Sequence, residues 1–149
     1  MTRFIKYHPR SNTYVIEKRA FLEEDLTLDG NVIVGPEVKF WKNLTVSGRL
    51  ELGKGSIVQG NVKAGSAIIC AAAKVLGNIE TVSELVLLDR ARINIAVWGG
   101  DIRVRPGCSL GSVKAVGPLE LVGKVAVKRV EPFTKVGNMS GKLISVPKN

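Results

Sequence analysis

The sequence predicts an all-β protein, a single-domain parallel β-helix in which short strands coil around a common axis. Three observations lead to this prediction: a repeat of nearly constant length, alternation of apolar and polar residues inside each repeat, and glycine between the apolar runs. Self-similarity at a fixed period is typical of chains in which each unit buries its apolar face only against its neighbours. The repeating unit here is strand-like.

The repeat extends over residues 26–129 and divides into six segments of 18, 18, 17, 16, 18 and 17 residues. The segments begin at Leu26, Leu44, Val62, Ile79, Ile95 and Val113. A rough further unit follows, so we expect six to seven coils of 16–18 residues each. We therefore assign residues 26–130 to the β-helix core.

Within a segment the apolar residues alternate, as at Leu44 and Val46 and again at Leu50 and Leu52. A period of two is expected of a strand with one buried face. Gly48 separates the two runs, at a corner where the backbone needs conformations that a Cβ would disfavour. Strands of about four residues separated by such corners fit three short faces in each coil.

Two adjacent aromatic residues, Phe40 and Trp41, follow the first coil. Successive side chains of a strand point to opposite sides, so these two rings cannot both enter a narrow interior. We therefore expect at least one of them to point outward, where it packs against a neighbouring coil or offers a contact surface.

Length and composition are those of one folded domain. The chain has 149 residues, of which 45% are hydrophobic and 23% charged, and this excludes a largely disordered polypeptide. The longest apolar run, residues 67–73, is far shorter than the roughly 20 residues of a membrane-spanning helix. The N-terminus lacks the apolar core of a signal peptide. We expect a cytoplasmic protein whose two cysteines, Cys70 and Cys108, are inert free thiols.

The two ends lack the repeat. Residues 1–25 are predicted to form an N-terminal tail or cap that closes the first rung, with a short strand at residues 13–16. The alternative for the first seven residues is a weak contact with the inner face of an anionic membrane through Phe4, Ile5 and Tyr7. Residues 131–149, interrupted by Pro132 and Pro147, are predicted to form a terminal coil and a C-terminal tail.

The net charge of +9 leans toward the C-terminal end of the chain. Four lysines of this end fall where a strand face would point to solvent: Lys114, Lys124, Lys128 and Lys142. Such lysines protect strand edges from unwanted pairing. We favour this interpretation over a dedicated polyanion site, and nucleic acid is then a disfavoured partner. A basic β-solenoid that binds anionic lipid or nucleic acid along its lysine-bearing face is the alternative function.

The sequence contains no recognisable catalytic or metal-binding pattern. His8 is the single histidine and stands beside Pro9, with no second histidine to share a metal or a proton. Serines and carboxylates are scattered singly, and no glycine-rich phosphate loop is followed by lysine and serine or threonine. We therefore predict a protein that is not an enzyme and that needs no cofactor or metal.

Pairs of an aliphatic residue and glycine, spaced by six at Leu110, Val116 and Val122, resemble the hexapeptide repeat of left-handed β-helix acyltransferases and γ-type carbonic anhydrases. Those enzymes take their catalytic or metal-binding residues from histidines on the solenoid. Residues 26–129 contain no histidine. The resemblance therefore bears on the handedness of the coil and implies no activity.

The array more closely resembles the bactofilins, the polymer-forming cytoskeletal proteins of bacteria and archaea. The resemblance covers about residues 26–130 and is carried by two apolar residues, a glycine and two further apolar residues, as in LTVSGRLEL, VQGNVKAGSAII, VLGNIETVSELVLL and VKAVGPLEL. It implies a right-handed, roughly triangular β-helix that assembles end to end without nucleotide. The non-polar filaments so formed often lie on the inner membrane and act as scaffolds for other proteins.

Assembly also follows from the apolar residues that continue almost to the C-terminus. An uncovered apolar end of a solenoid is a contact surface, because a second copy stacked on it buries the apolar residues and extends the ladder. We therefore expect a homopolymer whose interface includes six apolar residues: Leu119, Leu121, Val125, Val127, Phe133 and Leu143.

Overall fold

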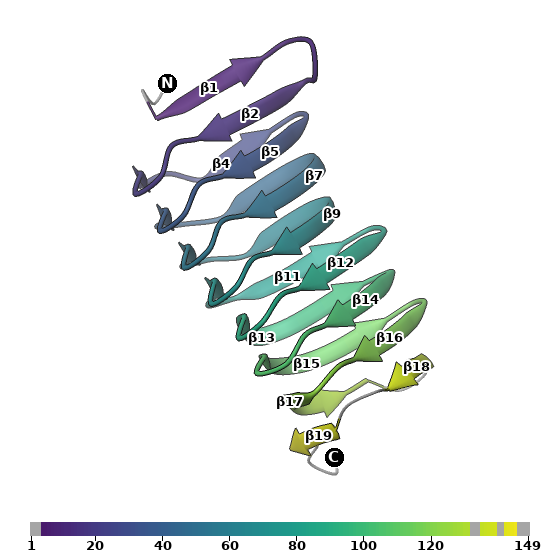
Figure 1. Ribbon diagram of the computed structural model, residues 1–149. Helices are drawn as coiled ribbons and strands as arrows, with labels where there is room; N and C mark the ends of the chain where they lie inside the picture. Colours follow the sequence, from purple (N-terminus) through teal and green to yellow (C-terminus); the bar gives the residue numbers. More distant parts are fainter. Residues whose placement is uncertain (1–3, 132–134, 140–141, 146–149) are drawn as a thin grey trace.

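The computed structural model describes residues 4–131, 135–139 and 142–145, which form a parallel β-solenoid of about seven turns (Figure 1). No helix occurs in this part of the chain. Each turn contributes rungs to three parallel ladders, which we call ladders A, B and C. The prediction of an all-β, single-domain parallel β-helix is confirmed.

Ladder A is the widest of the three, and most of its rungs have four residues. It consists of β2 (Thr13–Ile16), β5 (Asn31–Val34), the second halves of β7 (Leu44–Leu52) and β9 (Val62–Ile69), β12 (Glu84–Leu87), β14 (Asp101–Val104), β16 (Pro118–Leu121) and β18 (Lys135–Met139).

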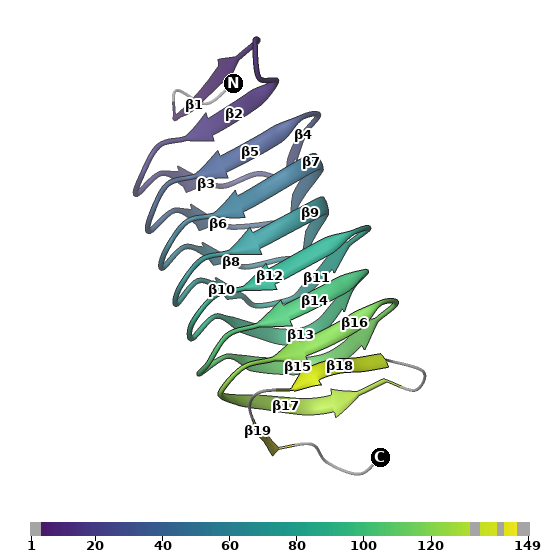
Figure 2. The ribbon, with the colours of Figure 1, turned by 45° about the vertical axis from the view of Figure 1, so that its right-hand side comes forward.

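Ladder B is narrow, and its first four rungs, stacked along the left side of Figure 2, have two residues each. It consists of β3 (Phe21–Leu22), β6 (Lys39–Phe40), β8 (Ile57–Val58), β10 (Lys74–Val75), the first parts of β13 (Arg92–Gly99), β15 (Ser109–Ala115) and β17 (Lys124–Val130), and β19 (Lys142–Ser145). Ladder C consists of β4 (Leu26–Leu28), the first parts of β7 and β9, β11 (Asn78–Thr81), and the later parts of β13, β15 and β17.

The side chains that point inward form one continuous aliphatic core along the rod. One coil illustrates the pattern: Leu50 and Leu52 of ladder A, Val58 of ladder B, and Val62 and Ala64 of ladder C are all at most 3% exposed. Burial of apolar surface stabilises the fold by about 25 cal/mol per Å². Because every coil repeats the same inward pattern, each one buries its neighbours and none is stable alone.

The aromatic pair at the second coil divides between core and surface, as predicted. Phe40 is 1% exposed and fills the interior, whereas Trp41 is 56% exposed and points outward. Phe40 is the largest fully buried side chain among the described residues. The alternation of a strand places the two rings on opposite sides of the same rung.

The register differs from the predicted segmentation at one point. Ile79 pairs with Val97 and not with Ile95, so this coil has 18 residues and the next, from Val97 to Val113, has 16. Ile93 and Val97 take the inward positions, and Ile95 between them is 59% exposed. The prediction was wrong here because three apolar residues at alternate positions satisfy the same pattern, while only two of them reach the core.

The glycine corners between ladders C and A stack in a column. The Gly48 N–H donates to Gly30 O at 2.9 Å, and the Gly117 N–H donates to Gly100 O at 2.7 Å. A Cβ added to Gly48 would lie 2.7 Å from Gly30 O, which is closer than real Cβ contacts allow. These corners therefore need glycine because successive coils approach so closely.

The solenoid begins before residue 26. The predicted strand at residues 13–16 is present as β2, and it pairs in parallel with β5. Ile16 and Leu22 are at most 2% exposed, so residues 13–25 already follow the inward pattern although they lack the glycine corners of later coils. Among the described strands, β1 (Ile5–His8) alone precedes the first coil, and it pairs antiparallel with β2.

Candidate interaction surfaces

The N-terminal end of the rod is covered on one ladder and open on the other two. β1 covers β2, whereas β3 pairs only with β6, and β4 only with β7, among the described strands. The Leu26 N–H donates to Asn43 O at 3.0 Å, toward the second coil. Because neighbouring residues of a strand direct their backbone groups to opposite sides, Thr27 directs its N–H toward the open end. This end therefore offers two unpaired edges.

The residues expected to contact a membrane take part in the cap. Phe4 and Ile5 are partly buried and pack against the core. Tyr7 is 47% exposed; its ring lies 4.6 Å from that of Tyr14, and its hydroxyl donates to Asn12 Oδ1 at 2.8 Å. The three side chains thus form no common outward face. Membrane contact through all of them would require the cap to open.

The C-terminal interface residues lie deeper than expected. β18 pairs with β16, and β19 pairs with β17, so a partial coil covers the rungs that were expected to be uncovered. Four of these residues form no exposed surface in the single chain, because they are at most 1% exposed, and their role in an interface stays a prediction: Leu119, Leu121, Val125 and Val127. The backbone of Leu143 pairs with that of Val125 in this covering layer. Phe133 lies outside the described residues.

Ladders A and B carry opposite charge on their outward sides. The described rungs of ladder A through β16 carry four carboxylates and two cations: Glu51, Glu84, Asp101, Glu120, Arg49 and Arg103. Over the same coils, ladder B carries no carboxylate and four cations: Lys39, Lys74, Arg92 and Lys124. Ladder B is therefore more positive than ladder A on its outward side.

The corner that leads from ladder A into ladder B adds further cations to this side. Each of the seven successive coils contributes at least one exposed cation to this corner or to the start of the ladder B rung. We call this row the cation file; its members are Lys18, Arg19, Lys39, Lys54, Lys74, Arg90, Arg92, Arg105 and Lys124. With a rise of about 4.8 Å per coil, the file is about 30 Å long.

Two members of the cation file have carboxylate partners in the described part of the chain. Arg19 Nε lies 3.5 Å from Glu37 Oε1, and Arg105 Nε lies 3.3 Å from Asp89 Oδ1. Both pairs are well exposed, and exposed pairs contribute at most about 1 kcal/mol. The other members form no ion pair among the described residues, so most of the file is available to an external anion.

Sequence reasoning missed the cation file because its members are not evenly spaced along the chain. The corners between ladders A and B have four residues each from the first coil to the sixth, but the cations occupy different positions within them or at the start of the ladder B rung. Aligning the segments on their second apolar run instead of their first could have revealed it.

The lysines expected to face solvent do so where the structure describes their side chains: Lys114, Lys124 and Lys128 are exposed.

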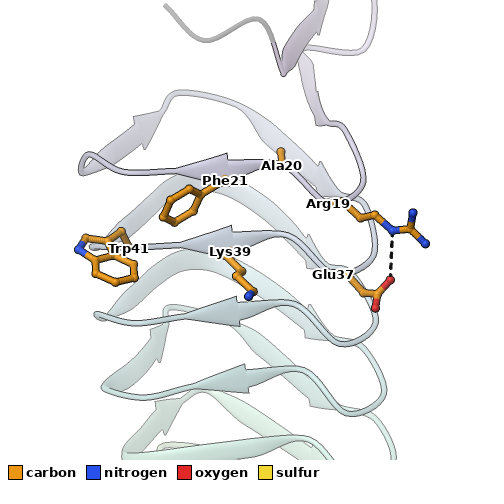
Figure 3. A pocket seen from close by; sticks show the side chains of 6 residues that line it. All are labelled: Arg19, Ala20, Phe21, Glu37, Lys39 and Trp41. Carbon is orange, nitrogen blue, oxygen red and sulfur yellow. Dashed lines mark ion pairs between the residues drawn. The ribbon is translucent and has the colours of Figure 1, made fainter.

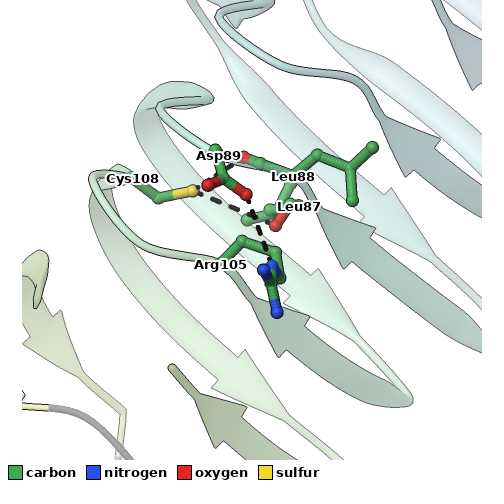
Figure 4. A network of polar contacts seen from close by, with 5 residues as sticks. All are labelled: Leu87, Leu88, Asp89, Arg105 and Cys108. Carbon is green, nitrogen blue, oxygen red and sulfur yellow. Dashed lines mark hydrogen bonds and ion pairs between the residues drawn. The ribbon is translucent and has the colours of Figure 1, made fainter. Parts of the chain in front are cut away.

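The ion pair of Arg105 and Asp89 lies beside a buried thiol (Figure 4). Cys108 is 1% exposed, and its Sγ donates to Leu88 O, 3.1 Å away. Burial raises the pKa of the Cys108 thiol. Cys70, which begins the corresponding corner two coils earlier, is partly exposed, and burial together with the nearby Glu51 carboxylate raises its pKa. Both cysteines are free.

An aromatic hollow of about 480 Å³ lies beside the N-terminal part of the cation file (Figure 3). Phe21 and Trp41, from consecutive coils, meet edge to face with ring centroids 5.7 Å apart, and both are about half exposed. Lys39 lies next to them, and the ion pair of Arg19 and Glu37 closes the far side. The hollow therefore combines an aromatic wall with charged groups.

A smaller hollow of about 210 Å³ lies on ladder C, around Trp98. Glu80 and Lys114 flank this indole, which is 46% exposed. Val116, which is 81% exposed, lines the same hollow from the corner toward ladder A. This surface has one cation and one carboxylate beside the indole, and so differs from ladder B in charge.

Within the described residues, no three His, Cys, Asp or Glu side chains come together as a group that could hold a metal ion. His8 is exposed at the end of β1. None of the described segments forms a helix that is long and apolar enough to cross a membrane. The surfaces that combine exposure with distinctive chemistry are therefore the open end, the cation file and the two aromatic hollows.

The chain matches no protein-family model, no curated protein and no solved structure. The resemblance of the repeat to bactofilins therefore stays a prediction, and function has to be argued from the surfaces of the rod.

Proposed function

We propose that the protein is a structural protein that assembles end to end into filaments and serves as a scaffold. The observation that carries this proposal is the open N-terminal end, where β3 and β4 each lack a partner on one side among the described strands. An unpaired strand edge is a template for another strand. The resemblance of the repeat to the polymer-forming bactofilins supports the same function.

A second copy of this chain is the partner that fits these edges. Its rungs have the same spacing and the same curvature, and they are already formed, so that pairing costs little conformational entropy. Leu26 is partly buried at this end and packs against the core; a second copy would bury it further. Two copies that meet by their N-terminal ends are related by a twofold axis and form a closed pair, so a filament without polarity also needs a like contact between C-terminal ends.

Substitutions of Thr27 test the role of the open edge. Thr27 is exposed in β4, and its N–H is directed toward the open end. Proline at this position removes that donor and blocks pairing without removing a bond to the second coil. We expect Thr27→Pro to sediment as a species no larger than a pair of rods in sedimentation velocity, whereas wild type and the matched control Thr27→Val sediment as polymers.

Circular dichroism spectra of the three proteins establish that the solenoid is intact. If Thr27→Pro keeps the wild-type spectrum and still sediments as a polymer, pairing through β4 is refuted. If Thr27→Val also sediments as a species no larger than a pair of rods, the effect belongs to the side chain and not to the edge, and the proposal again fails.

A further inference from the structure

The cation file is exposed and has at least one member in every coil from the first to the seventh. Its members come from neighbouring positions in each coil, between the end of the ladder A rung and the start of the ladder B rung. In this strip, nine cations face three carboxylates, Glu17, Glu37 and Asp89. A row of positive charge along a rod attracts a linear polyanion, whose counterions are released when it binds.

We propose that the cation file binds single-stranded nucleic acid along the long axis of the rod. This function is independent of end-to-end assembly, since it uses the side of the solenoid and not its end. Lysine and arginine side chains would contact the phosphates, and no described feature reads the bases in a specific way. The binding is therefore expected to be largely independent of sequence.

The distribution of carboxylates favours a linear ligand over a flat bilayer. The opposite margin of ladder B carries Glu23, Glu24 and Asp25, all exposed, in the first coil. A bilayer resting on ladder B would bring its anionic headgroups against these carboxylates, and like charges repel. A strand that follows the file passes along the other margin and approaches these carboxylates only beside Trp41, which neighbours Leu22 and Glu23 of the first coil.

The course of the file along one side of the rod favours a single strand over a duplex. Each strand of a duplex winds around the axis once in about 34 Å, so over a file of similar length it stays beside the cations only briefly. A single strand is flexible enough to follow the row. Phe21 and Trp41 lie at the N-terminal end of the file, where exposed rings provide a surface on which a base can stack.

Fluorescence anisotropy with a labelled oligothymidylate of about 20 nucleotides tests the proposal on the full chain. Wild type is expected to bind at low salt, with an affinity that falls steeply as salt increases. Lys39→Gln combined with Lys74→Gln removes two members of the file. This variant is expected to lose at least tenfold in affinity and to lower the slope of log affinity against log salt by about 1.4.

The matched control combines Lys63→Gln with Lys114→Gln, which removes two exposed lysines of ladder C. Its net charge equals that of the test variant, so only the position of the lost charge differs. We expect its affinity and salt slope to stay within about twofold of wild type. A second pair compares Trp41→Ala, expected to weaken binding about tenfold, with Trp98→Ala, expected to leave it unchanged.

Several outcomes would overturn the proposal. One is no binding of the oligonucleotide at low salt, and another is an equal loss in the two double variants, since net charge and not the file would then explain the affinity. Tighter binding to a duplex of the same length would also contradict it. So would tighter binding to vesicles of phosphatidylglycerol and phosphatidylcholine, with the same dependence on Lys39 and Lys74, because the file would then be a membrane contact.

Discussion

Ladders A and B share one backbone architecture and one aliphatic core but differ in almost everything that faces outward. Ladder A is wide, carries mostly carboxylates as its charged groups, and is covered by β1 at its N-terminal end. Ladder B is narrow, and the charged groups on its described rungs through β17 are all cations. Its first rung, β3, is open at the N-terminal side. The side chains that point inward specify the fold, whereas those that point outward can differ between the ladders.

The two proposed functions therefore use different parts of the molecule. End-to-end assembly depends on backbone edges of the first coil, which side-chain charge affects little. Binding of a polyanion depends on side chains distributed over all seven coils and on none of the edges. Substitutions can therefore abolish one activity and preserve the other.

The largest effect is expected from the shared core. Leu85 of ladder A and Val75 of ladder B lie in consecutive coils and are fully buried. Leu85→Ala should lower the free energy of unfolding by about 2–5 kcal/mol, because it removes buried methyl groups and leaves a cavity. Val75→Ala removes a smaller group and should cost about 1.5–3 kcal/mol. Urea unfolding followed by circular dichroism measures both; equal, negligible costs would contradict a common packed core.

A smaller effect is expected at the corner that joins the two ladders. Ser56 is fully buried; its Oγ donates to Gly35 O and accepts from the Val38 N–H, both at 3.0 Å. Ser56→Ala leaves both groups without this partner and should cost about 1–3 kcal/mol in the same unfolding measurement. The control is Ser109→Ala at an exposed site of ladder B, with an expected change below about 0.5 kcal/mol. Equal changes would show that the buried bonds contribute nothing.

The smallest expected effect is a difference in reaction rate between the two thiols of these corners, Cys70 and Cys108. Burial raises the pKa of Cys108, and burial and Glu51 raise that of Cys70. A raised pKa reduces the thiolate fraction at neutral pH, so both should react slowly with a disulfide reagent and faster as pH increases. Cys70, which is partly exposed, should react before Cys108. Single Cys→Ser variants assign the two phases; a faster Cys108 in the folded protein would contradict its buried position.

The inward half of the fold could be predicted from the sequence because alternation and period leave little choice. Leu44, Val46, Leu50 and Leu52 are all buried as the pattern requires. The pattern failed where a segment contains more alternating apolar residues than there are positions that point inward, as at Ile95. It also could not predict which end is covered, because covering depends on how distant segments pair.

The corners escaped prediction for a different reason. Glu37, Ala72 and Arg90 adopt positive φ angles of 57°, 59° and 63° between ladders A and B, although such conformations favour glycine. The Asn61 side chain accepts from the Asn78 N–H at 2.8 Å in the next coil, a contact that depends on exact stacking. Corner geometry fixes how members of the cation file in successive coils lie next to one another, so their arrangement in space could not be predicted before the corners were known.

The most direct test of end-to-end assembly is negative-stain electron microscopy of the untagged full chain, at low and at high salt and without nucleotide. The open edges of β3 and β4 predict narrow filaments at both salt concentrations, because backbone pairing and apolar contact are only weakly screened by salt. Discrete particles of single-rod size at both salt concentrations would contradict the account and would mean that the N-terminal end is closed in solution.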